Sequence, residues 1–169
     1  MLRIMDYNRI IRDLNGLTEE AFLEKVKSKF SLELAMDAMV KPQKFHEIRM
    51  YMGNKWYILT PNTAFYDDHD VIERLDVSIL QNNLLAPILG IQDPRTDKRI
   101  DFIGGIRGLR ELVEKVDSGQ YKVAFALFPT SMKQLMDVAD ADLVMPPKST
   151  WFEPKLRDAM VVHLIGDEK

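Results

Sequence analysis

The alternation of patterns between residues 99 and 139 constrains the fold of this chain most. Arg99–Ile103 has the composition of a short strand, and Ile106 starts an amphipathic helical pattern. A continuous apolar run at Lys122–Phe128 predicts a strand buried on both faces, and Met132–Ala139 predicts a second helix. Because a helix that joins two strands of one sheet forms a right-handed crossover, we expect these two strands to pair in parallel.

The rest of the chain adds a hairpin and several shorter elements. Gly53-Asn54 supplies the positive φ that a tight turn needs, so the flanking runs Phe45–Tyr51 and Lys55–Thr60 are predicted to pair in an antiparallel hairpin. Thr18 is placed to cap a helix at Glu19–Phe30. Shorter patterns predict strands at Leu2–Met5, Asp142–Met145 and Ala159–Ile165, a helical turn at Asn8–Leu14, and a helix at Val77–Leu89 with Asp76 as its cap. Together, the hairpin and the parallel unit predict an α+β fold, with a mixed sheet and helices packed on it.

Composition sets limits on class and compartment. The chain has 169 residues, 46% of them hydrophobic and 29% charged, which predicts one compact domain over residues 1–169. A net charge of −3 provides no global field for nucleic acid, and the absence of cysteine excludes disulfides and thiolate metal sites. No apolar run approaches the ~20 residues of a membrane helix, so we expect a cytoplasmic protein without a membrane partner.

A charged loop followed by glycines marks the stretch DPRTDKRIDFIGGIRGLR, Asp93–Arg110. Gly104-Gly105 is predicted to form a turn with positive φ that opens the helix at Ile106, where free backbone N–H groups can hold an anion. The cationic side chains in this stretch are Arg95, Lys98, Arg99, Arg107 and Arg110. The same pattern is typical of an ordinary strand-to-helix connector, because GGIRG lacks the spacing of a P-loop and the GxGxxG of a dinucleotide fold.

The segment MPPKSTWFEPKL is a second candidate site. Lys148, Ser149 and Thr150 offer a cation and hydroxyls that can hold phosphate or carboxylate, with Trp151 and Phe152 as apolar walls. A surface loop pinned by two aromatic side chains explains the pattern equally well. If it is a site, we expect this loop to converge with DPRTDKR, bringing Arg95 or Arg99 near Lys148 or Thr150. Tyr7-Asn8-Arg9 is a weaker candidate of the same kind.

No pattern predicts a metal site. His46, His69 and His163 lie in separate predicted elements without metal-ligand spacing, and a structural role is expected for each. The acidic run Asp67–Asp70 lacks the glycine and the later glutamate of a calcium loop, so a solvated turn is the better interpretation.

Several long strings resemble a known family. They are DYNRIIRDLNGLTEEAFLEKV, LDVSILQNNLLAPILGIQDPRTDKRIDFIGGIRG, FALFPTSMKQLM and MPPKSTWFEPKLRDAMVVHLI. Together they resemble the C-terminal part of the widespread bacterial family catalogued as domain of unknown function 1015. Members are longer, and their N-terminal part ends in a DGHHR-like motif reminiscent of the ParB and sulfiredoxin superfamily, which this sequence lacks. The chain is therefore expected to be a C-terminal domain cut from a longer protein.

The resemblance implies a function, because some members are reported as ATP-dependent kinases of free serine. For such a kinase ATP and magnesium are expected in the full-length protein, no cofactor in this chain alone, and no activity without the N-terminal part. The residues that the resemblance directs toward an anionic ligand are Arg95, Arg99, Arg107 and Lys148, with Ser149 and Thr150 as neutral contacts; catalytic residues stay unassigned.

The alternative is a binding or regulatory module, for example one that contacts nucleic acid phosphates as the ParB kinship suggests. Asp93, Asp97 and Asp101 interrupt the basic residues, which favours a small anionic ligand over a polymer. Further partners are expected to be the missing N-terminal domain and a second copy of the chain, paired through an apolar edge left uncovered.

Overall fold

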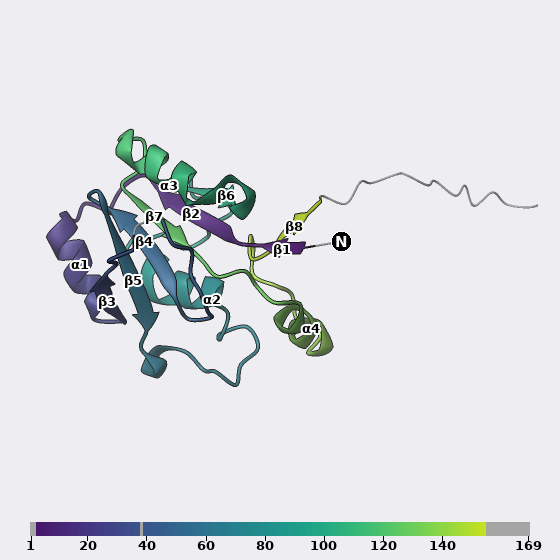
Figure 1. The fold of residues 1–169 in the computed structure, drawn as a ribbon. Coiled ribbons are helices and arrows are strands. Elements are labelled where there is room, and N and C mark those ends of the chain that lie inside the picture. Colours follow the sequence, from purple (N-terminus) through teal and green to yellow (C-terminus); the bar gives the residue numbers. More distant parts are fainter. Residues whose placement is uncertain (1–2, 38, 155–169) are drawn as a thin grey trace, which may run out of the picture.

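The computed structural model describes residues 3–37 and 39–154 (Figure 1). Its centre is a six-stranded sheet with the order β3-β5-β4-β7-β2-β6, in which every pairing is antiparallel. The strands are β2 (Tyr7–Ile11), β3 (Phe30–Leu34), β4 (Ile48–Met52), β5 (Lys55–Pro61), β6 (Ile100–Gly104) and β7 (Val123–Ala126). A separate antiparallel pair, β1 (Arg3–Met5) with β8 (Trp151–Glu153), lies beside the sheet next to the N-terminal end of β2 (Figure 1).

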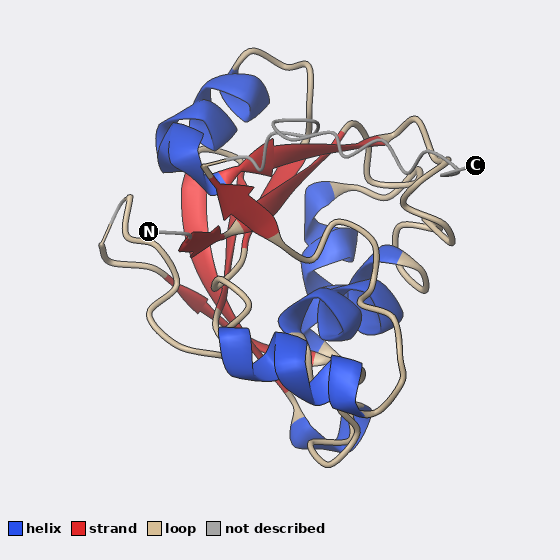
Figure 2. Cartoon of the chain, turned by 90° about the vertical axis from the view of Figure 1, so that its right-hand side faces the viewer, coloured by secondary structure: helices blue, strands red, loops and turns tan. Residues whose placement is uncertain are grey.

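Helices cover both faces of this sheet (Figures 1 and 2). The helical segments are α1 (Glu19–Lys27), α2 (Asp76–Leu80) with a π-helical turn (Gln81–Leu85), α3 (Gly108–Asp117), α4 (Met132–Asp140) and short 3₁₀ turns at Thr63–Phe65 and Gly105–Arg107. No helix of the described residues is long and apolar enough to cross a membrane.

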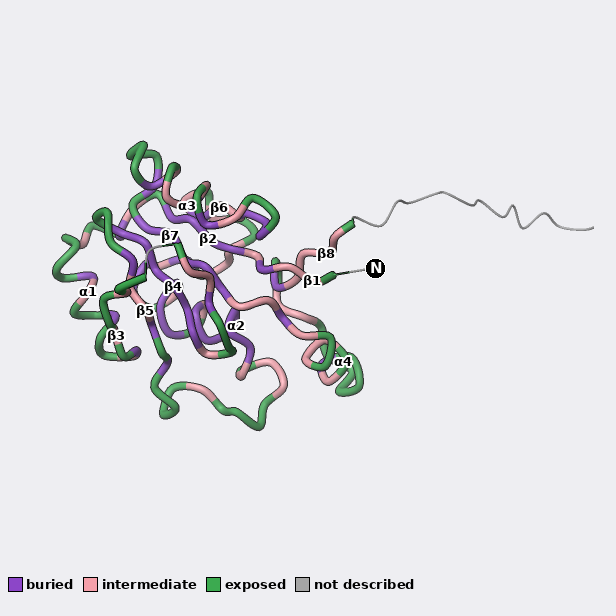
Figure 3. Tube along the Cα trace, viewed as in Figure 1, coloured by how far each residue is buried: buried purple, intermediate pink, exposed green. Residues whose placement is uncertain are grey.

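Strand alternation divides the core into two layers. Met50 of β4 packs with the layer that contains α1 and α2, whereas its neighbour Tyr51 packs with the layer of α3. Successive side chains of a strand point to opposite faces, so one strand supplies both layers. Figure 3 shows the resulting buried centre, with exposed chain at the outer helix surfaces and loops.

The predicted α+β class is confirmed, but the direct parallel pairing is wrong. β6 and β7 run in the same direction and are connected through α3, yet each pairs antiparallel with β2, which lies between them. The helical turn predicted at Asn8–Leu14 is wrong for the same reason, because Tyr7–Ile11 is that inserted strand. Its polar residues concealed it: the Asn8 side chain is fully buried and accepts a hydrogen bond from the Leu127 backbone N–H at 3.0 Å.

The expectations that rest on neighbouring residues agree better with the structure. The hairpin of β4 and β5 is confirmed, with Gly53 and Asn54 at φ 57° and 59°. Thr18 caps α1 as predicted, although this helix ends at Lys27 and Phe30 starts β3. Ser131 caps α4 with a reciprocal capping box.

Three other expectations have different outcomes. The helix predicted at Val77–Leu89 begins at Asp76 and changes to a π-helical turn, and Asp76 accepts a bond from the His46 N–H at 2.9 Å instead of capping the helix. Residues 142–145 do not form a strand. The strand predicted at Ala159–Ile165 lies outside the described residues.

Candidate functional site

Two adjoining cavities open beside the N-terminal end of β2. The first, here called the loop cavity, has a volume of about 460 Å³ and is lined by Tyr7, Met145, Pro146 and residues 148–152. The second, here called the Arg9 cavity, measures about 610 Å³ and lies between Arg9, the α2 region, the 92–95 loop and residues 144–147. Met145 and Pro146 belong to the walls of both. The predicted convergence of the DPRTDKR and MPPKSTWFEPKL loops is therefore confirmed.

Pairing of β1 with β8 holds the aromatic wall of the loop cavity in place. Met5 lies opposite Trp151, whose ring meets that of Tyr7 edge-on at a centroid distance of 5.2 Å. Gly104 permits this packing, because a Cβ there would lie 2.8 Å from Cδ2 of Trp151. Glycine is therefore needed at position 104 so that the Trp151 ring can pack against the backbone.

The glycine turn differs from its prediction. Gly104 has φ −66°, and the positive φ in this region belongs to Gly108, where α3 begins. The space beside Gly105 is filled by the Asp6 carboxylate, since a Cβ on Gly105 would lie 2.0 Å from Asp6 Oδ1. Asp6 in turn accepts hydrogen bonds from Lys41 Nζ at 2.9 Å and Asn8 Nδ2 at 2.7 Å. A carboxylate of the chain itself thus lies against the turn that was expected to hold an anion.

Arg95 lies at the wall of the Arg9 cavity but already has an acidic partner. Its Nη2 lies 2.9 Å from Asp93 Oδ2, and its hydrogen bonds lower the pKa of that carboxyl. Asp93 and Pro94 line the same cavity. The expected approach of Arg95 to Lys148 or Thr150 stays a prediction, because these two residues line the neighbouring loop cavity.

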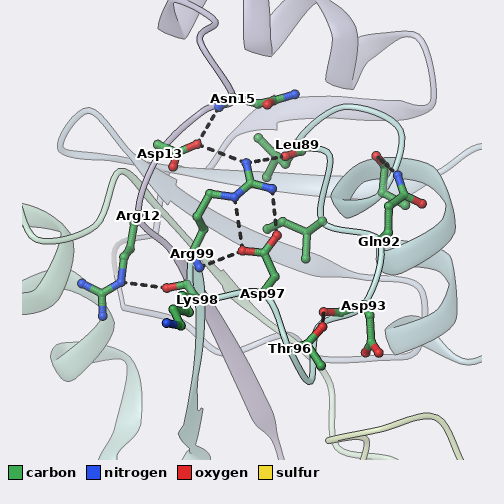
Figure 4. Close-up of polar contacts among 12 residues, drawn as sticks. Arg12, Asp13, Asn15, Leu89, Gln92, Asp93, Thr96, Asp97, Lys98 and Arg99 are labelled. Atoms are coloured by element: carbon green, nitrogen blue, oxygen red, sulfur yellow. Dashed lines mark hydrogen bonds and ion pairs between the residues drawn. The ribbon is translucent and has the colours of Figure 1, made fainter.

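Arg99 connects the loop before β6 to residues Asp13 and Leu89 through polar contacts (Figure 4). Its guanidinium donates to Asp97 Oδ2 at 2.8 Å and to the Leu89 carbonyl at 3.0 Å, and it lies 3.5 Å from Asp13 Oδ1. The hydrogen bond from Arg99 lowers the pKa of Asp97. Arg99 lines neither cavity, so its position is that of a structural connector.

Arg107 also lies away from the cavities. It occupies the 3₁₀ turn before α3, and its Nη1 donates to Glu111 Oε1 at 2.9 Å, one helical turn later. Arg110 makes the equivalent pair with Glu114 at 2.8 Å. The resemblance directed Arg107 toward a ligand, whereas this geometry is that of an exposed helix pair.

The Lys148–Thr150 segment lines the loop cavity as one unit. Lys148 has φ 56°, and its Nζ lies 5.8 Å from the ring centroids of both Tyr7 and Phe102, within the range of a cation–π contact. Ser149 is buried, and its carbonyl accepts a bond from Thr130 Oγ1 at 2.9 Å. The segment is therefore held by its backbone, while the Lys148 ammonium lies against aromatic rings.

Arg9 is a stronger candidate for binding a ligand than the sequence analysis predicted. The guanidinium belongs to β2, is almost fully buried and lies at the wall of the Arg9 cavity. In the sequence, a charged residue followed by the apolar pair Ile10-Ile11 is compatible with a strand, whereas the prediction for this stretch is a helical turn. Among the described residues, no cluster of three or more histidine and acidic side chains is placed to hold a metal ion.

Residues 1–78 match the family described as Protein of unknown function (DUF1015). The predicted resemblance is thereby confirmed over this stretch, which contains the first of the four strings quoted above. None of the curated protein sequences matches the chain.

Solved structures with a similar fold include proteins described as free serine kinases. One, in complex with AMP, is 14% identical with a TM-score of 0.51, and the match covers 89% of this chain and 54% of that protein. A variant in complex with ADP gives a TM-score of 0.50, with the same identity and coverage. A conserved hypothetical protein from Pyrococcus furiosus gives 0.53 at 12% identity, covering 89% and 56% of the two chains. The chain therefore has the fold of part of these proteins and spans little more than half of their length.

Proposed function

We propose that this chain is the nucleotide- and anion-binding part of an ATP-dependent kinase that phosphorylates free L-serine. In this reaction the serine hydroxyl oxygen attacks the γ-phosphorus of ATP. The bond from that phosphorus to the bridging oxygen breaks, ADP leaves, and the hydroxyl proton passes to a base. Magnesium bound together with the nucleotide would supply positive charge that offsets the charge of its phosphates.

The observation that carries the proposal is the pair of adjoining cavities in a fold similar to nucleotide-bound free serine kinases. The loop cavity combines the Lys148 ammonium and the Thr150 hydroxyl with aromatic rings, which suits a ligand that has both a ring and charged groups. The Arg9 cavity adds Arg95 and Arg9. Cationic side chains of this kind stabilise the charge on a transferring phosphoryl group.

We further propose that catalysis needs a second part of the protein. The chain spans 54% of the AMP-bound free serine kinase, and no described residue is assigned as the base. The isolated chain is therefore expected to bind ligands without turning them over.

Calorimetric titration of the chain with ADP, adenosine and a short DNA duplex tests the binding part of this proposal. We expect ADP to bind and DNA to give no signal. Replacing Lys148 by Gln removes the charge and keeps a polar side chain, and it should weaken ADP binding about tenfold, as expected for loss of one charge-assisted contact. Arg110→Gln is the matched control, because Arg110 is exposed and lies on α3 away from both cavities.

The catalytic part is tested by phosphoserine formation from serine and ATP, followed by mass spectrometry. The isolated chain should form none, whereas the chain joined to a DUF1015 N-terminal part should form it at a rate that Lys148→Gln lowers. Absence of ADP binding, or binding of DNA alone, would overturn the proposal in favour of a different ligand class.

A further inference from the structure

Arg9 carries a buried positive charge without a carboxylate partner among the described residues. Its residue is 3% exposed, and its guanidinium donates to the backbone carbonyls of Tyr7 and, at 3.0 Å, of Lys148. The guanidinium carbon lies 5.6 Å from the centroid of the Phe102 ring. These contacts fix the side chain in position but leave its charge uncompensated.

The surroundings make this charge unusual. Burial lowers the pKa of Arg9 to about 10, so the group is still protonated at neutral pH. The acidic side chains on neighbouring segments are engaged elsewhere: Asp6 with Lys41, Asp93 with Arg95, and Asp101 with Arg12. A buried charge is costly unless it is paired, and a ligand that supplies the opposite charge recovers part of that cost.

Arg9 keeps unused hydrogen-bond donors and lines a cavity. A guanidinium has five N–H donors, and the described residues accept bonds from two of its nitrogens, Nη1 and Nη2. Arg9 lines the cavity of about 610 Å³, which also has the polar side chains of Ser78, Gln81 and Asn82 in its walls. The cavity walls are mostly apolar and carry a few polar side chains, so a planar fork of donors at this wall offers a defined polar contact that matches the two oxygens of a carboxylate or phosphate.

We propose that Arg9 binds an oxyanion of a small ligand in the Arg9 cavity. The shared chemistry is a phosphate or carboxylate group, supplied by a nucleotide or by the amino acid substrate. The inference rests on the proposed function for the identity of these ligands, while the oxyanion site itself depends only on the geometry around Arg9.

The position of Arg9 distinguishes it from Arg95 in the same cavity. Arg9 belongs to a central strand, opposite Phe102 on β6 and Phe125 on β7, so its backbone is fixed before a ligand arrives. Arg95 lies on an exposed loop and is neutralised by Asp93. A prearranged donor costs less conformational entropy on binding, so Arg9 contributes more to affinity than Arg95.

The test is calorimetric titration of the chain with ADP, adenosine, phosphoserine, serine and inorganic phosphate. Arg9→Gln should weaken binding of the ligand whose oxyanion occupies the site by about ten- to hundredfold and leave adenosine unaffected. Arg12→Gln is the matched control, since Arg12 follows the same strand and makes a half-exposed pair with Asp101. A loss confined to ADP and phosphate identifies a nucleotide phosphate; an equal loss for serine and phosphoserine identifies the amino acid carboxylate; a loss for phosphoserine alone identifies its phosphate.

A second variant keeps the test decisive if Arg9→Gln does not fold. Val144 lines the same cavity and is 87% exposed, so Val144→Glu places a carboxylate at its wall without disturbing the core. It should weaken binding of the anionic ligands several-fold relative to Val144→Gln, and added salt should reduce the difference. Equal affinities in these two variants would overturn the inference.

The two proposals fail in different ways. ADP that binds wild type and Arg9→Gln equally well removes the oxyanion site and leaves the kinase proposal standing. Phosphoserine or phosphate that binds through Arg9, with no binding of ADP, removes the nucleotide part of the kinase proposal and supports the site. Anionic ligands that bind wild type no better than adenosine contradict the site directly.

Discussion

The arginines of the 93–110 stretch and Arg9 of β2 differ in how their charge is balanced. Arg95, Arg99 and Arg107 each have a carboxylate within 2.9 Å. Arg9 is buried deeper than any of them and donates to backbone carbonyls. The density of cations along the sequence predicts that the first group binds an anionic ligand. The ion pairs in the structure instead leave Arg9 as the arginine available for such a ligand. A cation with an internal partner must exchange that partner for a ligand, so its net gain on binding is smaller.

Two carboxylates, Asp76 and Asp97, differ in the same way in how their charge is balanced. Asp76 gives the largest expected effect on stability. Burial raises the pKa of Asp76 to about 6, whereas Arg99 lowers the pKa of Asp97. Because the pKa of Asp76 in the folded protein lies above the ordinary value of 3.8, the stability that its protonated form contributes is fully present below pH 3.8 and is lost as the pH rises through about 6. The shift corresponds to about 3 kcal/mol.

Urea unfolding of wild type and Asp76→Asn between pH 4 and pH 8 measures this effect. The amide keeps an acceptor for the His46 N–H, so the variant should gain stability relative to wild type as the pH rises. A stability difference that is constant with pH would show that Asp76 is accommodated as a carboxylate.

The close contact between the Asp6 carboxylate and Gly105 gives the next largest expected effect on stability. Gly105→Ala places a methyl group against the Asp6 carboxylate and displaces either this group or the backbone, at a cost of about 2–3 kcal/mol. Gly16→Ala is the control for a glycine in open space, where only the positive φ of 76° is strained. Thermal unfolding of both variants should show the larger loss for Gly105→Ala; the reverse order would mean that Asp6 moves aside freely.

Arg99→Gln tests the structural role of a paired arginine. Losing the Asp97 pair and the bond to the Leu89 carbonyl should lower the free energy of unfolding by about 1–2 kcal/mol, because both contacts are partly shielded from solvent. Phosphate and ADP affinities of the folded variant should match those of wild type. A tenfold loss of affinity with unchanged stability would restore Arg99 as a ligand contact.

Arg107→Gln is expected to have the smallest effect. Exposed helix pairs of this spacing contribute about 0.3–0.5 kcal/mol, and Arg107 lines neither cavity. The free energy of unfolding of the Arg107→Gln variant should therefore change within that range. Its affinity for ADP should equal that of wild type in the titration used for Arg9→Gln. A ligand effect as large as that of Arg9→Gln would remove the distinction between paired and unpaired arginines.

The sequence alone determined the elements that depend on neighbouring residues. Gly53-Asn54 specified the hairpin turn, and Thr18 and Ser131 specified helix starts, because each acts within three or four residues of itself. It also located the two loops that converge at the cavities.

Tertiary structure decided the rest. That Tyr7–Ile11 is an interior strand, inserted between two strands from residue 100 onward, depends on pairings between residues at least 89 positions apart. Whether an arginine is neutralised or available depends on which carboxylate the fold brings to it, and for Arg9 the fold brings two carbonyl groups and an aromatic ring instead. Charge compensation acts through space over a few ångströms, so its pattern is set only when the chain has folded.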